Sequence, residues 1–229
     1  MYYHGTAKDI ADIIVESQQM KSSVGDDQWL GDGYYFYCDA EYAFRWILIK
    51  YTNNFRNEFA SDYSNIYDKY SIISAEINIS PERLFSMDNI HHRLLFIETK
   101  NEINKKLEKS KKYRGSVVDG VVFNFLFQKL NYGDQFDAVK AVFPISYIFD
   151  NSRMDFLPEP QICVKNEKVI SNYKKCSSEK VPEEFEKFIV RYNKIKYDLM
   201  QKRTDYSKYK RAPKCIKYKK EELTGYDGN

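Results

Sequence analysis

Two glycines, Gly31 and Gly33, stand one residue apart and lead directly into an aromatic run, Tyr34 to Tyr37. Glycine carries no side chain, so the backbone there can come close to a ligand. The aromatic run adds a flat apolar surface beside that backbone. The segment is therefore a candidate binding site, although a Gly-x-Gly pattern also suits a tight turn between two core elements.

Two further short motifs contain residue types that can take part in chemistry. His4-Gly5-Thr6 lies near the start of the chain, and its histidine can act as a hydrogen-bonding group near neutral pH. Gln161 opens a late apolar stretch, and Glu159 shares its strand face if the extended backbone continues through Pro160. The alternatives are a core histidine at position 4 and a polar residue that marks a strand end at position 161.

The periodicity of the sequence predicts both helices and strands around these motifs. A helix is expected after Thr6, which would cap it, with Ile10, Ile13, Ile14 and Ser17 on its inner face. The aromatic run predicts a strand, and apolar spacing predicts a helix over residues 40–50. Alternation and apolar spacing further predict strands over 71–79, 138–143 and 161–165 and helices over 91–112 and 117–130. Prolines 81 and 144 are expected to end the first two of these strands.

Length and composition restrict the class of protein. A chain of 229 residues with 43% hydrophobic content can bury a sizeable core, and a formal charge of +3 implies no partner for the whole chain. No apolar run reaches the roughly 18 residues of a membrane span, and no leader pattern is visible, so we expect a cytoplasmic protein without a membrane partner. The four cysteines are scattered, which argues against a disulfide framework and against a metal site.

The composition changes after Asn172, and we expect two parts, residues 1–172 and residues 173–229. The second part begins with a charged helix over 182–202 whose apolar side can pack on the core. Residues 202–220 then hold nine Lys or Arg with interleaved tyrosines, a composition that suits single-stranded nucleic acid or a merely solvated tail. Residues 52–70 are expected to form a loop and short helix, a candidate lid.

The order of the three motifs resembles the ADP-ribosyltransferases of the histidine-tyrosine-glutamate class, which include diphtheria toxin and the poly(ADP-ribose) polymerases. Trp46 follows Tyr35 by eleven residues, where those enzymes place a second aromatic. The chain also resembles uncharacterised bacterial proteins with similar Tyr-His-Gly-Thr, Trp-Leu-Gly and Gln-Ile-Cys-Val patterns. The likeness covers roughly residues 1–172 and implies an α+β fold with a split β-sheet core, flanking helices and a C-terminal helical, basic extension.

The resemblance also implies NAD as the substrate and a role for each motif. Tyr35 and Trp46 would hold the nicotinamide ring, and Tyr35→Phe should be mild. His4 would bind the adenosine-side ribose, and Gly5 would leave its backbone free for the nicotinamide carboxamide, with Thr6 and Gly33 completing the NAD-binding set. Nicotinamide leaves through an oxocarbenium-like transition state, so a catalyst must stabilise the developing positive charge.

The chain departs from the family pattern at two positions. Gln161 stands at the position of the family's glutamate, so Glu159 would have to supply a carboxylate beside it. Ala43 stands where a serine often contacts the carboxamide. The missing glutamate disfavours chain elongation more than transfer of a single ADP-ribose.

The expected function is therefore mono-ADP-ribosylation of a macromolecule, with nucleic acid, in particular RNA, or protein as the acceptor. A bacterial toxin or anti-phage effector would have such an activity, with an antitoxin or other regulatory protein as a further partner. Two alternatives remain open at this stage, a non-catalytic module that binds NAD or ADP-ribose and an NAD glycohydrolase.

Overall fold

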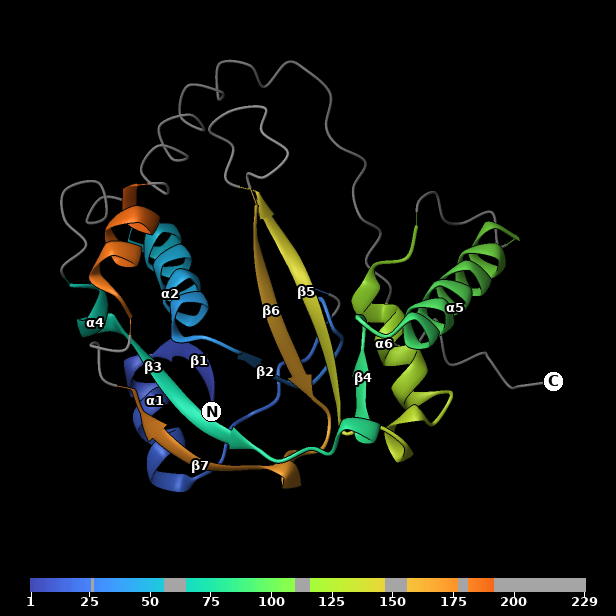
Figure 1. Ribbon diagram of the computed structural model, residues 1–229, viewed down its shortest axis with the longest axis horizontal. Helices are drawn as coiled ribbons and strands as arrows, with labels where there is room; N and C mark the ends of the chain where they lie inside the picture. The colour runs from blue at the N-terminus through green and yellow to red at the C-terminus, as the bar shows by residue number, and fades with distance from the viewer. Residues whose placement is uncertain (26, 56–64, 110–115, 147–155, 177–180, 192–229) are drawn as a thin grey trace, which may run out of the picture.

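The strands of the chain join into one mixed sheet. The computed structural model describes residues 1–25, 27–55, 65–109, 116–146, 156–176 and 181–191 (Figure 1). Its strands are β1 (Tyr2–Ala7), β2 (Tyr34–Tyr37), β3 (Tyr70–Ile77), β4 (Leu84–Ser86), β5 (Ala138–Ser146), β6 (Phe156–Val164) and β7 (Ile170–Lys175). They are arranged in the order β4-β5-β6-β2-β1-β3-β7. Only the β4–β5 pair of this sheet is parallel.

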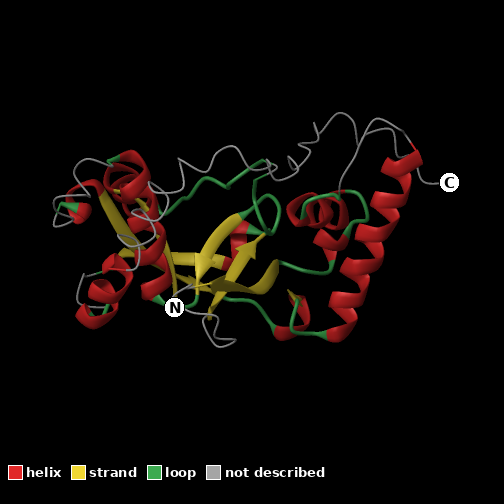
Figure 2. Cartoon of the chain, turned by 90° about the horizontal axis from the view of Figure 1, so that it is seen from above, coloured by secondary structure: helices red, strands yellow, loops and turns green. Residues whose placement is uncertain are grey.

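Helices pack on both faces of the sheet, and Figure 2 shows two groups of helices with the strands between them. The helices are α1 (Lys8–Ser17), α2 (Ala40–Asn54), α4 (Ile66–Lys69), α5 (Ile90–Lys109) and α6 (Asp119–Gln128). Residues 183–191 are also helical. Short 3₁₀ turns are η1 (Pro81–Arg83), η2 (Tyr132–Asp134) and η3 (Glu167–Val169).

Alternate strand residues show which helices share a face. On β3, Ile72 packs in a core cluster with α2, whereas Ile73 packs in a cluster with α1. Successive strand residues point to opposite faces, so α1 and α2 cover opposite faces of the sheet. On β6, Cys163 packs with α5 and α6, whereas Ile162 packs with α1. One face therefore carries α2 over β1–β3 and α5–α6 over β4–β6.

The α+β class is confirmed, and so are most of the predicted elements. The predicted strands at 34–37, 71–79, 138–143 and 161–165 correspond to β2, β3, β5 and β6, and the predicted helices correspond to α2, α5 and α6. The prediction that Pro144 ends its strand was wrong, because β5 continues to Ser146 opposite Phe156. Strand β2 pairs β6 only from Gln161 onward, so among the described strands the preceding part of β6 pairs with β5 alone, and Pro158 and Pro160 are tolerated there.

The N-terminal motif belongs to a longer strand than expected. Thr6 pairs with Ser71 inside β1 and does not cap a helix, and α1 begins two residues later, at Lys8. On this helix Ala11 and Ile14 are buried, whereas Ile10 and Ile13 are exposed. The predicted inner face of this helix was therefore wrong in two of its apolar positions.

Several features lie beyond the sequence predictions. Strands β4 and β7 were not predicted, and β7 straddles the expected boundary after Asn172. Residues 183–191 confirm the start of the charged helix. The central part of the candidate lid, residues 56–64, and the whole basic segment 202–220 lie outside the described residues.

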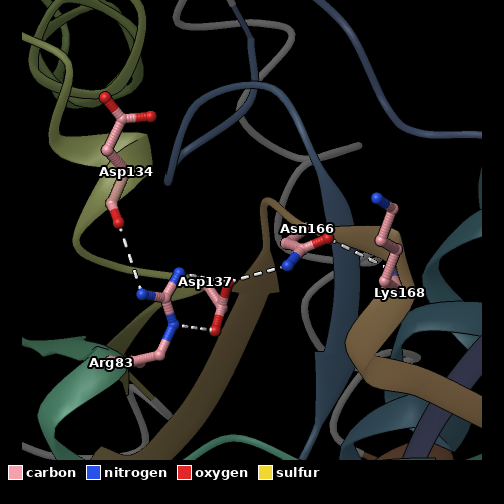
Figure 3. A network of polar contacts seen from close by, with 5 residues as sticks. All are labelled: Arg83, Asp134, Asp137, Asn166 and Lys168. Atoms are coloured by element: carbon pink, nitrogen blue, oxygen red, sulfur yellow. Dashed lines mark hydrogen bonds and ion pairs between the residues drawn. The ribbon is translucent and has the colours of Figure 1, made fainter.

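A polar network joins the β4 side of the sheet to the turn after β6 (Figure 3). Arg83 donates from Nε and Nη2 to the two carboxylate oxygens of Asp137, at 2.5 and 2.8 Å. Asn166 donates a further hydrogen bond to Asp137 at 2.8 Å. The Arg83 guanidinium, helped by Asn166, holds the pKa of the buried Asp137 below its usual 3.8. The network fixes the start of β5 between two loops.

We expect Asp137→Asn to lower the free energy of unfolding at pH 7 by about 2 kcal/mol, because it replaces charge-assisted bonds by neutral ones. A carboxyl with a depressed pKa stabilises the fold above its unfolded value and loses that effect as the pH falls through its folded value. The difference between parent and variant should therefore shrink below pH 3.8. Urea unfolding of parent and variant at pH 7, and again below pH 3.8, measures this difference. Asp12→Asn, which removes a half-exposed pair with Lys175, is the control and should change little.

Candidate functional site

The three strands that carry the sequence motifs are direct neighbours in the sheet, in the order β6-β2-β1. Tyr37 of β2 lies opposite Gln161 of β6 on one side and Tyr3 of β1 on the other. Segments from the beginning and from the last third of the chain therefore meet at the centre of the sheet, and β2 separates them by a single strand.

His4 lies at the junction of β1 and β2. Its Nδ1 donates a hydrogen bond to the Tyr35 carbonyl oxygen at 2.8 Å, and its ring centroid is 6.2 Å from that of Trp46. Burial lowers the pKa of His4 to about 4, an effect that the Tyr35 bond opposes in part. The imidazole is therefore neutral at pH 7. With the proton on Nδ1, the other ring nitrogen, Nε2, can accept a hydrogen bond.

The low pKa of His4 links protonation to folding. A histidine protonates near pH 6.5 in the unfolded chain and near 4 in the folded one. The folded state is then favoured fully above pH 6.5 and loses this advantage as the pH falls toward 4. We expect the parent to lose on the order of 2 kcal/mol across this window through His4. His4→Gln, which does not titrate, should show a flatter profile in urea unfolding between pH 7 and 4, and parallel profiles would contradict the burial of this ring.

The structure shows a reason for glycine at position 5 that differs from the expected one. A Cβ atom at Gly5 would lie 2.6 Å from Ile47 Cγ2 and 2.7 Å from the Ala43 carbonyl oxygen, both on α2. It would also lie 3.3 Å from the Trp46 ring. The glycine therefore allows α2 to pack closely on β1, and a side chain would meet the helix before it met a ligand.

The two aromatic residues of the expected clamp belong to different core clusters. Tyr35 packs in the cluster below α5 and α6, and Trp46 packs in the cluster of α2. The Tyr35 hydroxyl accepts from the Leu30 backbone N–H at 2.8 Å and donates to the Gly31 carbonyl oxygen at 2.7 Å. Tyr35 thus anchors the loop before β2, and the expectation that Tyr35→Phe is mild conflicts with these two bonds, which the variant would lose.

The loop of Gly31 and Gly33 packs against protein on both sides. Both glycines have positive φ, +76° and +154°. A side chain at Gly33 would lie 2.5 Å from the Val164 carbonyl oxygen, and one at Gly31 would overlap Asn124 of α6. Lys165 Nζ donates to carbonyl oxygens on either side of Gly31, those of Leu30 and Asp32, both at 2.6 Å. These contacts fit the alternative of a tight turn between core elements, and Gly33 also lines a cavity of about 310 Å³ together with Asn124 and Lys165.

A buried polar cluster lies where α2 passes over β6, and it consists of Tyr37, Arg45, Glu159 and Gln161. Arg45 Nη1 contacts Glu159 Oε2 at 2.7 Å, and Gln161 Nε2 donates to Glu159 Oε1 at 2.5 Å. Glu159 is 1% exposed and Gln161 is 7% exposed. Burial raises the pKa of Glu159, and Arg45 and Gln161 oppose the rise. The expected pairing of Glu159 with Gln161 on one strand face is therefore present.

Sequence reasoning missed Arg45. The sign that could have revealed it is a single cation between Phe44 and Trp46 within an otherwise apolar stretch of α2. A cation that packs against a core requires a carboxylate partner, because an unpaired buried charge is costly. Glu159 of β6, which lies under α2, is that partner.

In a comparison with known proteins, the chain is similar in sequence to an archaeal protein. It is 35% identical over 215 residues to the uncharacterized protein MJ0359 of Methanocaldococcus jannaschii, and the match covers 86% of this chain and 95% of the relative. The chain belongs to the family of that protein. No protein-family model matches this family member, and no solved structure matches it either.

The described part of this family member shows two further negative findings. It contains no group of three or more His, Cys, Asp and Glu side chains that could hold a metal ion. None of its described helices is both long and apolar enough to cross a membrane. Cys38 and Cys163 are free thiols, and Cys163 is buried beside the Gly31 carbonyl.

Proposed function

We propose that the chain is an NAD-dependent ADP-ribosyltransferase, with an ADP-ribosyltransferase-like split-sheet core, that transfers a single ADP-ribose to a macromolecule. The observation that carries the proposal is the adjacency of β6, β2 and β1. It brings the motif of His4, the aromatic strand of Tyr35 and the pair of Glu159 and Gln161 to the centre of one sheet.

The polar groups at this centre suit the chemistry of the nicotinamide–ribose bond. In the proposed reaction this bond breaks with both electrons passing to the nicotinamide nitrogen, the acceptor atom bonds to the ribose carbon, and the acceptor releases one proton. The charge that develops on the ribose is positive, and the carboxylate of Glu159 is the buried negative group that can stabilise it. The side-chain N–H of Gln161 donates a hydrogen bond to Glu159. The side-chain carbonyl oxygen of Gln161 can then accept a hydrogen bond from a ribose hydroxyl.

Two further side chains fit a nucleotide substrate. His4 offers Nε2 to a ribose hydroxyl, because Nδ1 is held by the Tyr35 carbonyl. Trp46 is partly exposed beside His4 and can provide one flat face for a heterocycle, whereas Tyr35 is committed to its loop. The ring contact in this proposal therefore comes from Trp46. Transfer by a toxin or anti-phage effector remains part of the proposal through the family resemblance.

A non-catalytic module that binds NAD or ADP-ribose is the second candidate, and the Arg45–Glu159 contact favours it. A carboxylate that is paired at 2.7 Å with a guanidinium offers less net charge to a developing cation. In that case Glu159 would be a structural ion pair, and the chain would bind without turnover.

Incubation of the full chain with NAD labelled in its adenosine part separates these functions. Transfer predicts label on an added macromolecule and release of nicotinamide in equal amounts. Free labelled ADP-ribose without a labelled acceptor would indicate a glycohydrolase. Saturable binding with no nicotinamide release would support the binding module and refute the transferase.

A further inference from the structure

An aromatic cavity of about 370 Å³ opens on the same sheet face as the Glu159–Gln161 pair, between β5 and the helices α5 and α6. Its walls include Trp29 from the loop before β2, Phe143 from β5, Phe96 from α5 and Phe123 from α6. Small-molecule sites in proteins have volumes of about 300 to 1,000 Å³, so this cavity fits one ring system and its nearest substituents.

The register of the sheet places this cavity next to the candidate catalytic pair. Ala141 and Phe143 line the cavity, and they lie directly opposite Gln161 and Glu159 on the neighbouring strand. Directly opposite residues share one sheet face, with Cβ atoms about 4.5 to 5.5 Å apart. A molecule bound in the cavity therefore lies one strand away from the carboxylate.

The rim of the cavity carries an exposed indole. Trp29 is 56% exposed, and its ring centroid lies 4.7 Å from that of Phe143. A large aromatic side chain that stays in water beside a cavity provides a stacking surface for a flat partner. Trp29 is held in place because the following residue, Leu30, is bonded through its N–H to Tyr35 and through its carbonyl to Lys165.

Both carboxylates in the cavity wall are paired with a lysine. Asp119 contacts Lys100 at 2.5 Å, and Asp88 contacts Lys140 at 3.6 Å. Arg93, also in the wall, donates to the Met87 carbonyl oxygen through Nε and Nη2. Carboxylates accept hydrogen bonds from the amino groups of nucleobases, and cations at the rim attract phosphates.

We propose that this cavity binds an unpaired nucleobase of a single-stranded nucleic acid and presents it as the acceptor of the ADP-ribose, an inference that rests on the proposed function. The base stacks on Trp29 and offers amino groups to Asp88 and Asp119. A nitrogen of the base forms the bond to the ribose carbon, nicotinamide leaves with the electron pair of its glycosidic bond, and the nitrogen releases its proton to water. A duplex does not enter, because its bases are stacked and paired.

The indole of Trp29 can report binding without any turnover. The chain has two tryptophans, so Trp46→Phe leaves Trp29 as the single tryptophan. Titration of this full-length variant with a short single-stranded RNA should quench its fluorescence, and the same RNA in duplex form should not. The titration is carried out in roughly 200 mM salt, which weakens binding that depends on phosphate contacts alone. Equal quenching by duplex and single strand would overturn the base pocket.

A pair of matched variants tests the stacking contact itself. Trp29→Ala should weaken the binding of a fluorescently labelled single strand, measured by anisotropy, by about tenfold or more, since stacking on one aromatic contributes about 1 to 3 kcal/mol. Ile13→Ala on α1 is the control, because Ile13 is 58% exposed, close to the 56% of Trp29, and packs on no part of the cavity. Equal affinity of the two variants would overturn the proposal, as would a labelled protein acceptor whose modification alone depends on Trp29.

Nicotinamide release separates this inference from the function on which it rests. Trp29→Ala should keep the release of nicotinamide into water while it loses label on RNA. No release from the parent chain would refute the proposed function, and with it the acceptor role, whereas the quenching result stands on its own. Release that persists without any dependence of RNA labelling on Trp29 would refute the pocket alone.

Discussion

Glu159→Gln is expected to lower the rate of nicotinamide release by about 100-fold or more, a typical cost of removing one preorganised electrostatic group from an active site. The carboxylate lies at the centre of the sheet, 1% exposed, where its charge is poorly screened by water. Gln161→Ala should cost less, because it removes a hydrogen bond and leaves the charge. The rate must be measured per folded molecule, with a melting curve for each variant.

A double variant separates catalysis from folding. Glu159→Gln alone leaves the Arg45 guanidinium, 19% exposed, without its carboxylate, which destabilises the fold. Arg45→Gln in the same chain removes that unpaired charge, so part of the melting temperature should return while the rate stays low. A rate that recovers together with the stability would show that Glu159 acts only as an ion pair.

The pH profile provides an independent check on the same residue. Burial raises the pKa of Glu159 above its ordinary 4.5, so the carboxylate is lost earlier than usual on acidification. On acidification the rate of the parent should begin to fall at a pH above 4.5. The rate of Glu159→Gln should not show this fall. Comparison of the two profiles at equal folded fraction identifies the group that titrates.

Gly120→Ala is expected to lower the free energy of unfolding by about 3 kcal/mol or more, at the upper end for an overpacked site. Gly120 lies in the first turn of α6, and a Cβ atom there would overlap the carbonyl oxygen of Gln28 and lie 3.3 Å from the backbone nitrogen of Gly31. Both neighbours are backbone atoms, so no side-chain rotation can relieve the overlap. The loop that carries Trp29 must move instead.

Gly133→Ala is the matched control for this substitution. A Cβ atom at Gly133 would meet only the Phe127 carbonyl oxygen, at 3.3 Å, so the change should cost little. Urea unfolding measures both variants, and the fluorescence of Trp29 in the Trp46→Phe chain reports whether the loop has moved. An unchanged midpoint for Gly120→Ala would show that the loop and α6 are not packed as described.

The sequence was informative where periodicity and packing agree. The aromatic run at Tyr34 to Tyr37 predicted β2, which is covered on both faces, and the apolar spacing after Asp39 predicted α2, whose apolar side is buried. Short β4 carries three residues, too few for a period, and it exists because its residues pair with Ala138 to Lys140. Strand β1 extends to Ala7 for the same reason, since the pairing with Tyr70 overrides the local preference for a cap.

The candidate site was predictable in its residues and not in its contacts. His4 and the Glu159–Gln161 pair lie on strands that β2 joins, an order of strands that could not be predicted from the sequence. The ring of Tyr35 was expected beside Trp46, but its hydroxyl satisfies two backbone groups of the loop, a demand that arises only in the folded chain. The cavity at Trp29 is lined by residues from four separate segments, and a local pattern in the sequence cannot predict that they come together.

The position of β6 has a consequence for the order of events during synthesis on the ribosome. Strand β6 lies between β2 and β5, so both of its partners leave the ribosome before it does. Until β6 emerges, the nascent chain exposes the edges of β2 and β5, which can pair with other chains and are natural sites for chaperone binding. The strand that carries Glu159 also joins β5 to β2, and the chain therefore acquires its buried carboxylate only in the step that unites the two parts of the sheet.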